Sequence, residues 1–201
     1  MKWLLGVLAV IVLLVLVVGG SLVGSRNELV TERNAVDGAW AQVDVALQRR
    51  ADLIPNLVET VKGITKQEQA VFGEIADARS KLLSAGTPEG KIAANGQLDG
   101  ALGRLLALAE NYPQLRSSEN FLRLQDELAG TENRIAVERK RYNDTLQDYN
   151  TYVQQFPGSL FASSMGFKVN NAYFAASEGS RAVPKVDFGT QQSQPQPEPA
   201  H

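Results

Sequence analysis

Residues 121–156 read FLRLQDELAGTENRIAVERKRYNDTLQDYNTYVQQF, and this stretch decides the fold. An apolar or aromatic side chain returns at every seventh position, at Phe121, Leu128, Ile135, Tyr142, Tyr149 and Phe156. Such a heptad repeat keeps one face of a long α-helix apolar, so it predicts a helix that packs lengthwise on other helices. We interpret the aromatic members as core rather than as a ligand-binding face. The stripe predicts that Ile135 is buried and that Glu132 faces solvent or a bundle edge.

Outward from this stretch, apolar stripes with helical spacing predict three further helices. The four expected ranges are 27–51, 54–84, 88–111 and 118–155. Helix starts and stops agree with them, because Thr87-Pro88-Glu89 is typical of a helix N-terminus and Tyr112-Pro113 ends a helix. Pro55 has two interpretations, the first residue of the second helix or the site of a kink inside one longer helix. Short connections make neighbouring helices antiparallel, so the sequence predicts an all-α, elongated antiparallel four-helix bundle.

The N-terminal stretch Trp3–Val23 contains 21 residues without a charge. As a helix it is roughly 31 Å long, about the thickness of a bilayer core. We expect a transmembrane anchor at residues 1–24 that contacts lipid through residues 3–23. A cleaved signal peptide is the alternative, and its disadvantages are the long apolar core and the lack of a clear A-x-A site. Flanking positive charges are nearly balanced, with a weak preference for the bundle on the non-cytoplasmic side.

The rest of the chain divides by composition. Residues 25–156 carry the helical stripes and are expected to form the bundle. Residues 157–190 are rich in Gly, Ser, Ala and aromatic residues, which predicts an irregular segment that packs on the bundle. Residues 191–201, QQSQPQPEPAH, are polar and proline-rich, which predicts disorder.

Composition excludes several classes of function. The chain has 201 residues, no cysteine and one histidine, His201. It therefore has no disulfide, no thiolate chemistry, no Cys/His zinc site and no internal histidine base. With 20 basic and 22 acidic residues, it lacks the basic excess of a nucleic-acid-binding protein. We expect neither an enzyme nor a cofactor.

The polar residues Arg49, Arg50, Asp52 and Asn56 cluster at the predicted turn between the first two helices. As a binding patch, they would suit a partner protein or a phosphate head group. The structural alternative is that Asp52 and Asn56 satisfy helix-end backbone groups while the arginines pair with nearby acids.

Two acidic residues, Glu68 and Glu138, fall in line with apolar stripes. A dinuclear carboxylate site in a helical bundle uses Glu-x-x-His pairs, and the chain has no histidine to supply them. We therefore interpret each as a buried acid that pairs with an arginine. A Ca²⁺ or Mg²⁺ site made of carboxylates alone is the alternative, and it would need more converging oxygens.

The run at residues 49–58, RRADLIPNLV, strongly resembles the LemA family of bacteria. Further matches are Glu68, Ala78-Arg79, Glu110-Asn111-Tyr112-Pro113-Gln114-Leu115, Glu132-Asn133-Arg134-Ile135, Tyr142-Asn143, Tyr149-Asn150, Phe156-Pro157 and Gly166-Phe167. The resemblance implies an N-terminal membrane helix and an antiparallel helical bundle, without a settled molecular function. Relatives often have an aromatic residue and a histidine where this chain has Ile64 and Gln67.

Together these features predict a membrane-anchored, non-enzymatic scaffold or interaction module of the bacterial cell envelope. It would be a single-pass protein of the inner membrane, with other membrane or envelope proteins as partners and a second copy of the chain as a further candidate. The alternative is an envelope sensor that binds a ligand or metal through polar residues of the bundle.

Overall fold

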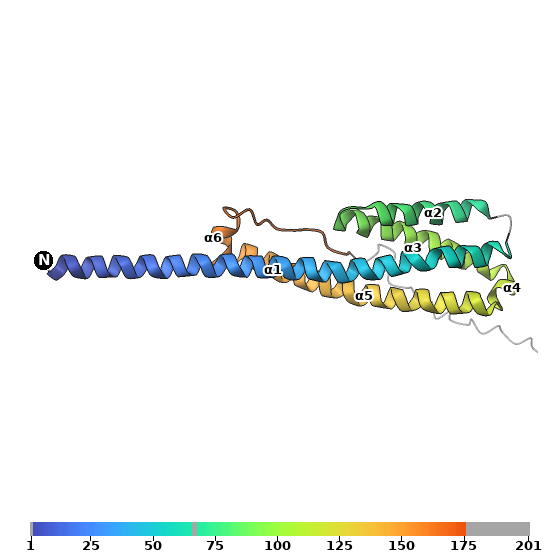
Figure 1. The fold of residues 1–201 in the computed structure, drawn as a ribbon. Coiled ribbons are helices and arrows are strands. Elements are labelled where there is room, and N and C mark those ends of the chain that lie inside the picture. The colour runs from blue at the N-terminus through green and yellow to red at the C-terminus, as the bar shows by residue number, and fades with distance from the viewer. Residues whose placement is uncertain (1, 66–67, 176–201) are drawn as a thin grey trace, which may run out of the picture.

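The computed structural model describes residues 2–65 and 68–175 (Figure 1). Within these residues the fold is all-α, as predicted, with six helices and no strand. The helices are α1 (Lys2–Lys62), α2 (Gln69–Ser84), α3 (Pro88–Glu110), α4 (Pro113–Arg116), α5 (Glu119–Gln154) and α6 (Gly158–Ala162). The predicted disordered segment 191–201 lies outside the described residues.

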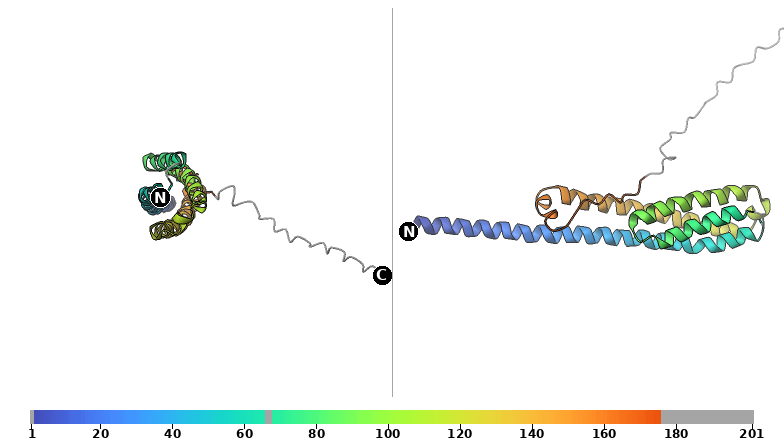
Figure 2. Two further views of the ribbon diagram at one scale, coloured as in Figure 1. Left: turned by 90° about the vertical axis from the view of Figure 1, so that its right-hand side faces the viewer. Right: turned by 90° about the horizontal axis from the view of Figure 1, so that it is seen from above.

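The long helices alternate in direction, so the molecule is an elongated up-down-up-down bundle (Figure 1). α1 and α5 lie side by side and form the longest contact between helices. The hairpin of α2 and α3 packs on the part of α1 that is far from the N-terminus. Figure 2 shows the four long helices end-on and shows α1 extending well beyond the others at its N-terminal end.

The predicted boundary between the first two helices is wrong, because α1 continues without interruption over Lys2–Lys62 and contains Pro55. A proline has no N–H, so the carbonyl of Ala51, four residues earlier, loses its helical hydrogen bond. Arg79 of α2 supplies the missing donor, since its Nε donates to the carbonyl oxygen of Ala51 at 2.7 Å. The interpretation of Pro55 as part of one longer helix is therefore correct, and α2 begins at Gln69.

The other helix limits agree closely with the predicted ones. α3 covers Pro88–Glu110, and α5 covers Glu119–Gln154. Thr87 is the N-cap of α3, where its side chain accepts a hydrogen bond from the Gly90 amide at 3.1 Å. This bond satisfies one of the amide groups that a helix start leaves without a partner. The short helix α4 was not predicted.

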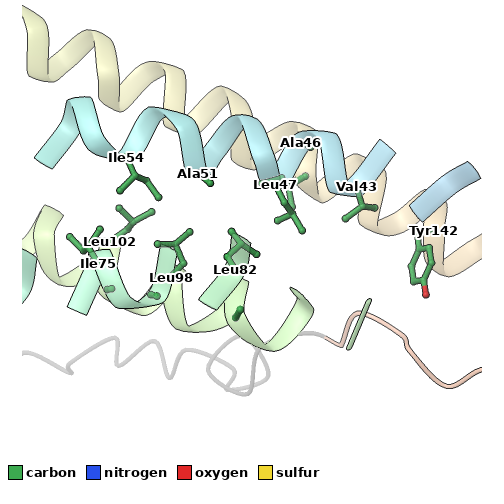
Figure 3. Close-up of a cluster of buried hydrophobic side chains, with 14 of the residues drawn as sticks. Val43, Ala46, Leu47, Ala51, Ile54, Ile75, Leu82, Leu98, Leu102 and Tyr142 are labelled. Carbon is green, nitrogen blue, oxygen red and sulfur yellow. The ribbon is translucent and has the colours of Figure 1, made fainter. Parts of the chain in front are cut away.

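Apolar side chains of α1 face α2 and α3 across the bundle core (Figure 3). The buried residues that meet there are Val43, Ala46, Leu47, Ala51 and Ile54 of α1, Ile75 and Leu82 of α2, and Leu98 and Leu102 of α3. Burial of such side chains is the main driving force for folding, at about 25 cal/mol per Å² of apolar surface.

The heptad stripe of α5 is buried over most of its length. Phe121, Ile135, Tyr142 and Tyr149 are buried, and Leu128 is half-buried. The last member of the stripe, Phe156, is not buried, because 80% of it is exposed. Its assignment to the core is wrong, for the reason that α5 ends at Gln154 and the helical period no longer applies beyond it.

Residues 167–175 are irregular and pack along α5. The side chain of Asn143 makes two hydrogen bonds with the backbone of Phe174. Its Nδ2 donates to the Phe174 carbonyl at 2.8 Å, and its Oδ1 accepts from the Phe174 amide at 3.0 Å. One heptad later, Asn150 makes the same pair of bonds with the backbone of Asn170, at 2.6 and 2.8 Å. The hydroxyl of Tyr149 donates to the Lys168 carbonyl at 2.9 Å. These side chains replace the backbone hydrogen bonds that an irregular segment lacks.

The N-terminal part of α1 is exposed on all sides up to residue 18. Among the described helices, only α1 is long and apolar enough to cross a bilayer, with a mean hydropathy of 2.9 in its most apolar window. An N-terminal signal sequence would meet the same criterion.

Candidate functional site

The guanidinium group of Arg50 lies at the centre of an ion cluster between α1, α3 and α5. Its Nη1 contacts Oδ1 of Asp99, lies 2.8 Å from Oε2 of Glu132 and donates to Oδ1 of Asn95 at 3.2 Å. The Glu132 contact has the distance of an ion pair but not the geometry of a hydrogen bond. One arginine of α1 therefore connects α3 and α5.

Two further residues complete the cluster. Asn95 Nδ2 donates to Oδ2 of Asp99 at 3.0 Å, one helical turn away on α3. Arg139 of α5 approaches the same oxygen with Nη2 at 3.9 Å. The Asp99 carboxylate therefore lies near two guanidinium groups, that of Arg50 on α1 and that of Arg139 on α5.

The cluster is buried at its arginine and open at its acids. The Arg50 side chain is 9% exposed, whereas the side chains of Asp99 and Glu132 are 38% and 44% exposed. A buried charge needs a partner, but a half-exposed carboxylate can also be solvated by water. Because two carboxylates already neutralise Arg50, this residue is unsuited to binding an external phosphate.

The structure does not bring the four predicted patch residues together. At 100° per residue, Arg49, Asp52 and Asn56 fall within about 60° of one another on α1, and all three are exposed. Arg50 points to the opposite, buried side. No turn lies among them, because α1 is continuous there.

The three exposed residues share their face with an apolar side chain. Val45 lies one turn before Arg49 on this face and is exposed. Asp52 accepts a hydrogen bond from Gln48 Nε2 at 3.0 Å. We call the surface formed by Val45, Arg49, Asp52 and Asn56 the α1 outer face. It combines an apolar contact with both signs of charge and an amide.

The two acids that were expected to pair with an arginine are half-buried, and within residues 2–65 and 68–175 neither forms an ion pair. Glu68 precedes α2, and its Oε1 accepts a long hydrogen bond from the hydroxyl of Tyr112 at 3.5 Å. Glu138 has a buried Oε2 that meets no hydrogen-bond donor in the described part of the chain. Residues 2–65 and 68–175 contain no group of three acidic, histidine or cysteine side chains arranged to hold a metal.

An aromatic group lies beside the ion cluster, on the side nearer the N-terminus of α1. Tyr142 meets Trp40 edge-on at 5.3 Å between ring centroids and Phe174 at 5.9 Å. The guanidinium of Arg139 lies over the Phe174 ring at 5.0 Å. Burial raises the pKa of Tyr142 to about 12, and the negative charge of Glu89 contributes to the same shift.

Glu132 is half-buried, in agreement with the predicted position at a bundle edge, and its carboxylate also pairs with Arg50. Asn95 and Asp99 were not singled out from the sequence. The sequence contained a signal for Asn95, since this polar residue shares the buried face of α3 with Leu98 and Leu102. A polar residue on an apolar stripe indicates a buried hydrogen-bonding partner.

The family profile supplies the decisive comparison, because the LemA family matches residues 39–188, more than half of the chain. The chain belongs to the LemA family. The resemblance carried by the run at residues 49–58 is thereby confirmed.

Curated relatives of this LemA-family chain include two groups. The magnetosome protein MamQ of Magnetospirillum gryphiswaldense is 27% identical over 168 positions, which cover 71% of this chain and 62% of the relative. Two MamQ proteins of Paramagnetospirillum magneticum match to the same extent. Protein LemA of Metamycoplasma hominis is 26% identical over 169 positions, which cover 84% of this chain and 75% of the relative. The alignment thus spans less than two thirds of the MamQ proteins.

The motifs that carry the LemA resemblance make tertiary contacts in this chain. Arg50 and Glu132 form the ion pair between α1 and α5. Arg79 satisfies the backbone of α1. Asn143 and Asn150 hold the irregular segment on α5. Much of the quoted LemA pattern therefore has a structural role, whereas Arg49, Asp52 and Asn56 of its first run are exposed.

Proposed function

We propose that this LemA-family protein is a non-enzymatic interaction module of the bacterial cell envelope, anchored in the inner membrane by one span. The observation that carries the proposal is the continuity of α1, whose exposed apolar part and bundle part form one helix of 61 residues. At the standard rise, such a helix is about 90 Å long. Without a loop between anchor and bundle, the bundle would stand as a rod on the bilayer.

We infer that the α1 outer face is the partner-binding surface. Within the described residues, its side chains form no ion pair or hydrogen bond with another helix, in contrast to Arg50, which pairs with Asp99 of α3. Protein interfaces combine apolar anchors with arginine, and Val45 and Arg49 provide both within one turn. The partner expected here is another membrane or envelope protein.

A photo-crosslinking residue placed at Arg49 in the full chain tests this surface in native membranes. We expect a discrete crosslinked species that contains the partner. The matched control is the same residue at Glu127, an exposed position on α5. Equal crosslinking at both positions would argue against a dedicated α1 surface, and so would the absence of any product at Arg49.

The anchor is tested separately. The full chain should sediment with membranes and resist extraction with carbonate, as an integral span does. Recovery of a mature form that begins near residues 20–26 would show that the apolar stretch is a cleaved signal peptide.

We further propose that the bundle lies on the non-cytoplasmic side. Lys2 and the N-terminal amine would then remain in the cytoplasm, in agreement with the positive-inside rule. Protease added to spheroplasts should digest the bundle. Protection of the bundle until the cells are lysed would place it in the cytoplasm.

A further inference from the structure

The end of the bundle nearest the N-terminal span carries no charge on its α5 and α6 side. Between Asp148 and Lys168, a stretch of 19 consecutive residues contains no acidic or basic side chain. Beside the last turns of α5, α1 still carries Arg26, Glu28, Glu32 and Arg33, but beyond Arg26 towards the N-terminus it is uncharged as far as Lys2. Two chain segments far apart in sequence therefore lose their charges at the same end of the molecule.

The register of the helices places α6 beside the end of the apolar run of α1. Trp40 contacts Tyr142, and the two helices are antiparallel, so Gln154 at the end of α5 lies level with about Glu28. α6 follows and contacts α1 further towards the N-terminus (Figures 1 and 2).

The burial pattern of α1 agrees with this register. Going from the N-terminus, the first covered positions are Gly19 and Leu22, which are half-buried, and Ser25, which is buried. They are spaced by three residues and therefore share one face of the helix. Gly19 and Leu22 still belong to the uncharged run 3–23, so α6 covers α1 at the level where the proposed span leaves the bilayer.

Large apolar side chains are exposed at this level. Phe156 is 80% exposed and Leu160 is 61% exposed. They are not part of a frayed end, because Gly158 between them packs tightly against Tyr152. A Cβ at Gly158 would lie 2.2 Å from the backbone oxygen of Tyr152, so only glycine fits there.

We propose that α6, through Phe156 and Leu160, is a second membrane contact that enters the interfacial region of the bilayer beside the α1 span. This inference rests on the proposed function, in which α1 crosses the membrane. Interfacial elements insert aromatic and aliphatic side chains by about 5–10 Å, and the absence of charge in residues 149–167 removes the main obstacle to such insertion.

We expect lipid, rather than a protein, to cover Phe156 and Leu160, because they continue the apolar surface of the proposed span. By the helix register, the exposed pair lies at about the level where the uncharged run of α1 ends, and the exposed Val23 belongs to that run. A second attachment point fixes how the rod is rotated about α1. It thereby decides which side of the bundle, including the α1 outer face, is turned towards neighbouring membrane proteins.

The absence of cysteine makes a direct test available. Single variants Phe156→Cys and Leu160→Cys of the full chain are nitroxide-labelled and reconstituted in vesicles of phosphatidylethanolamine and phosphatidylglycerol. The collision rates of each label with oxygen, which concentrates in lipid, and with a water-soluble nickel complex report its depth. Val12→Cys marks the span, and Leu122→Cys, an exposed apolar position at the opposite end of the bundle, marks water.

We expect the labels at 156 and 160 to favour oxygen, at a depth of roughly 5–10 Å below the headgroups. The label at 122 should favour nickel. If 156 and 160 behave like 122 while 12 lies in lipid, the second contact is refuted and the anchor stands. If 12 also lies in water, the proposed anchor fails. Shielding of 156 and 160 from both reagents would show a protein contact at this site and would equally overturn the proposal.

Discussion

Nε of Arg79 lies 2.7 Å from the carbonyl oxygen of Ala51, the acceptor that Pro55 deprives of its helical donor. A proline inside a helix costs about 3 kcal/mol, partly through this lost hydrogen bond. Ala51 is fully buried, so water cannot replace the donor. The side chain of α2 thus allows α1 to continue through a residue that would otherwise end it.

Arg79→Met should therefore destabilise the protein by roughly 1–3 kcal/mol, the cost of a buried carbonyl without a partner. Thermal or urea unfolding of the full chain in detergent micelles, followed by circular dichroism, measures the loss. The control is the same change in a Pro55→Ala background, where a restored N–H can serve the Ala51 carbonyl. There the loss should be smaller. An equal loss in both backgrounds would mean that Arg79 stabilises the fold in another way.

We expect that removing the acids of the Arg50 cluster destabilises the fold more than removing the arginine, because the arginine is buried and the acids are half-exposed. Asp99→Asn combined with Glu132→Gln leaves the buried guanidinium without a full counter-charge, at a cost of roughly 3 kcal/mol. Arg50→Met should cost less, since the two acids can be hydrated and Arg139 remains near Asp99.

The triple variant supplies the control for this prediction. With Arg50→Met already present, neutralising the two acids should have little further effect on the free energy of unfolding. Additive losses in the triple variant would contradict an interaction between these residues.

Because of Tyr142, we expect the free energy of unfolding to fall at alkaline pH. Burial raises its pKa from 10.0 to about 12, so the folded protein keeps a phenol proton that the unfolded chain releases near pH 10. The contribution of the neutral phenol is complete below pH 10 and is lost as the pH rises towards 12. Tyr142→Phe keeps the ring against Trp40 and should reduce this alkaline loss.

Free energies of unfolding measured across the alkaline range test the Tyr142→Phe variant. At neutral pH it should be at least as stable as the parent protein, because the hydroxyl has no hydrogen-bond partner in the described part of the chain. Identical alkaline slopes for the two proteins would contradict the assignment of the effect to Tyr142.

Asn150 should control the order of the irregular segment. Asn150→Ala removes its three hydrogen bonds to Asn170 and Tyr173, so amide hydrogen exchange in residues 168–174 should accelerate. The helical amides of α5 should change little. Gln147→Ala, at an exposed position one turn earlier, is the matched control and should leave the exchange unaltered. Equal acceleration in both variants would point to a general loss of stability.

Local periodicity made much of this fold readable from the sequence. The heptad of α5 predicted the buried Ile135 and Tyr142, because a rigid helical repeat carries side-chain direction over many turns. The cap at Thr87 and the limits of α3 and α5 followed from residue chemistry within a few positions. The candidate site was predicted only in part: Arg50 was included, but its acidic partners were not identified.

The tertiary structure decided the features that depend on distant residues. Whether Pro55 ends a helix depends on Arg79, 28 positions away on another helix. Whether Arg50 is exposed or neutralised depends on Asp99 and Glu132, which only the packing of α3 and α5 brings near it. Sequence patterns report the preferences of neighbouring residues, whereas satisfying a buried carbonyl or a buried charge requires a partner whose position is set by the packing of whole helices.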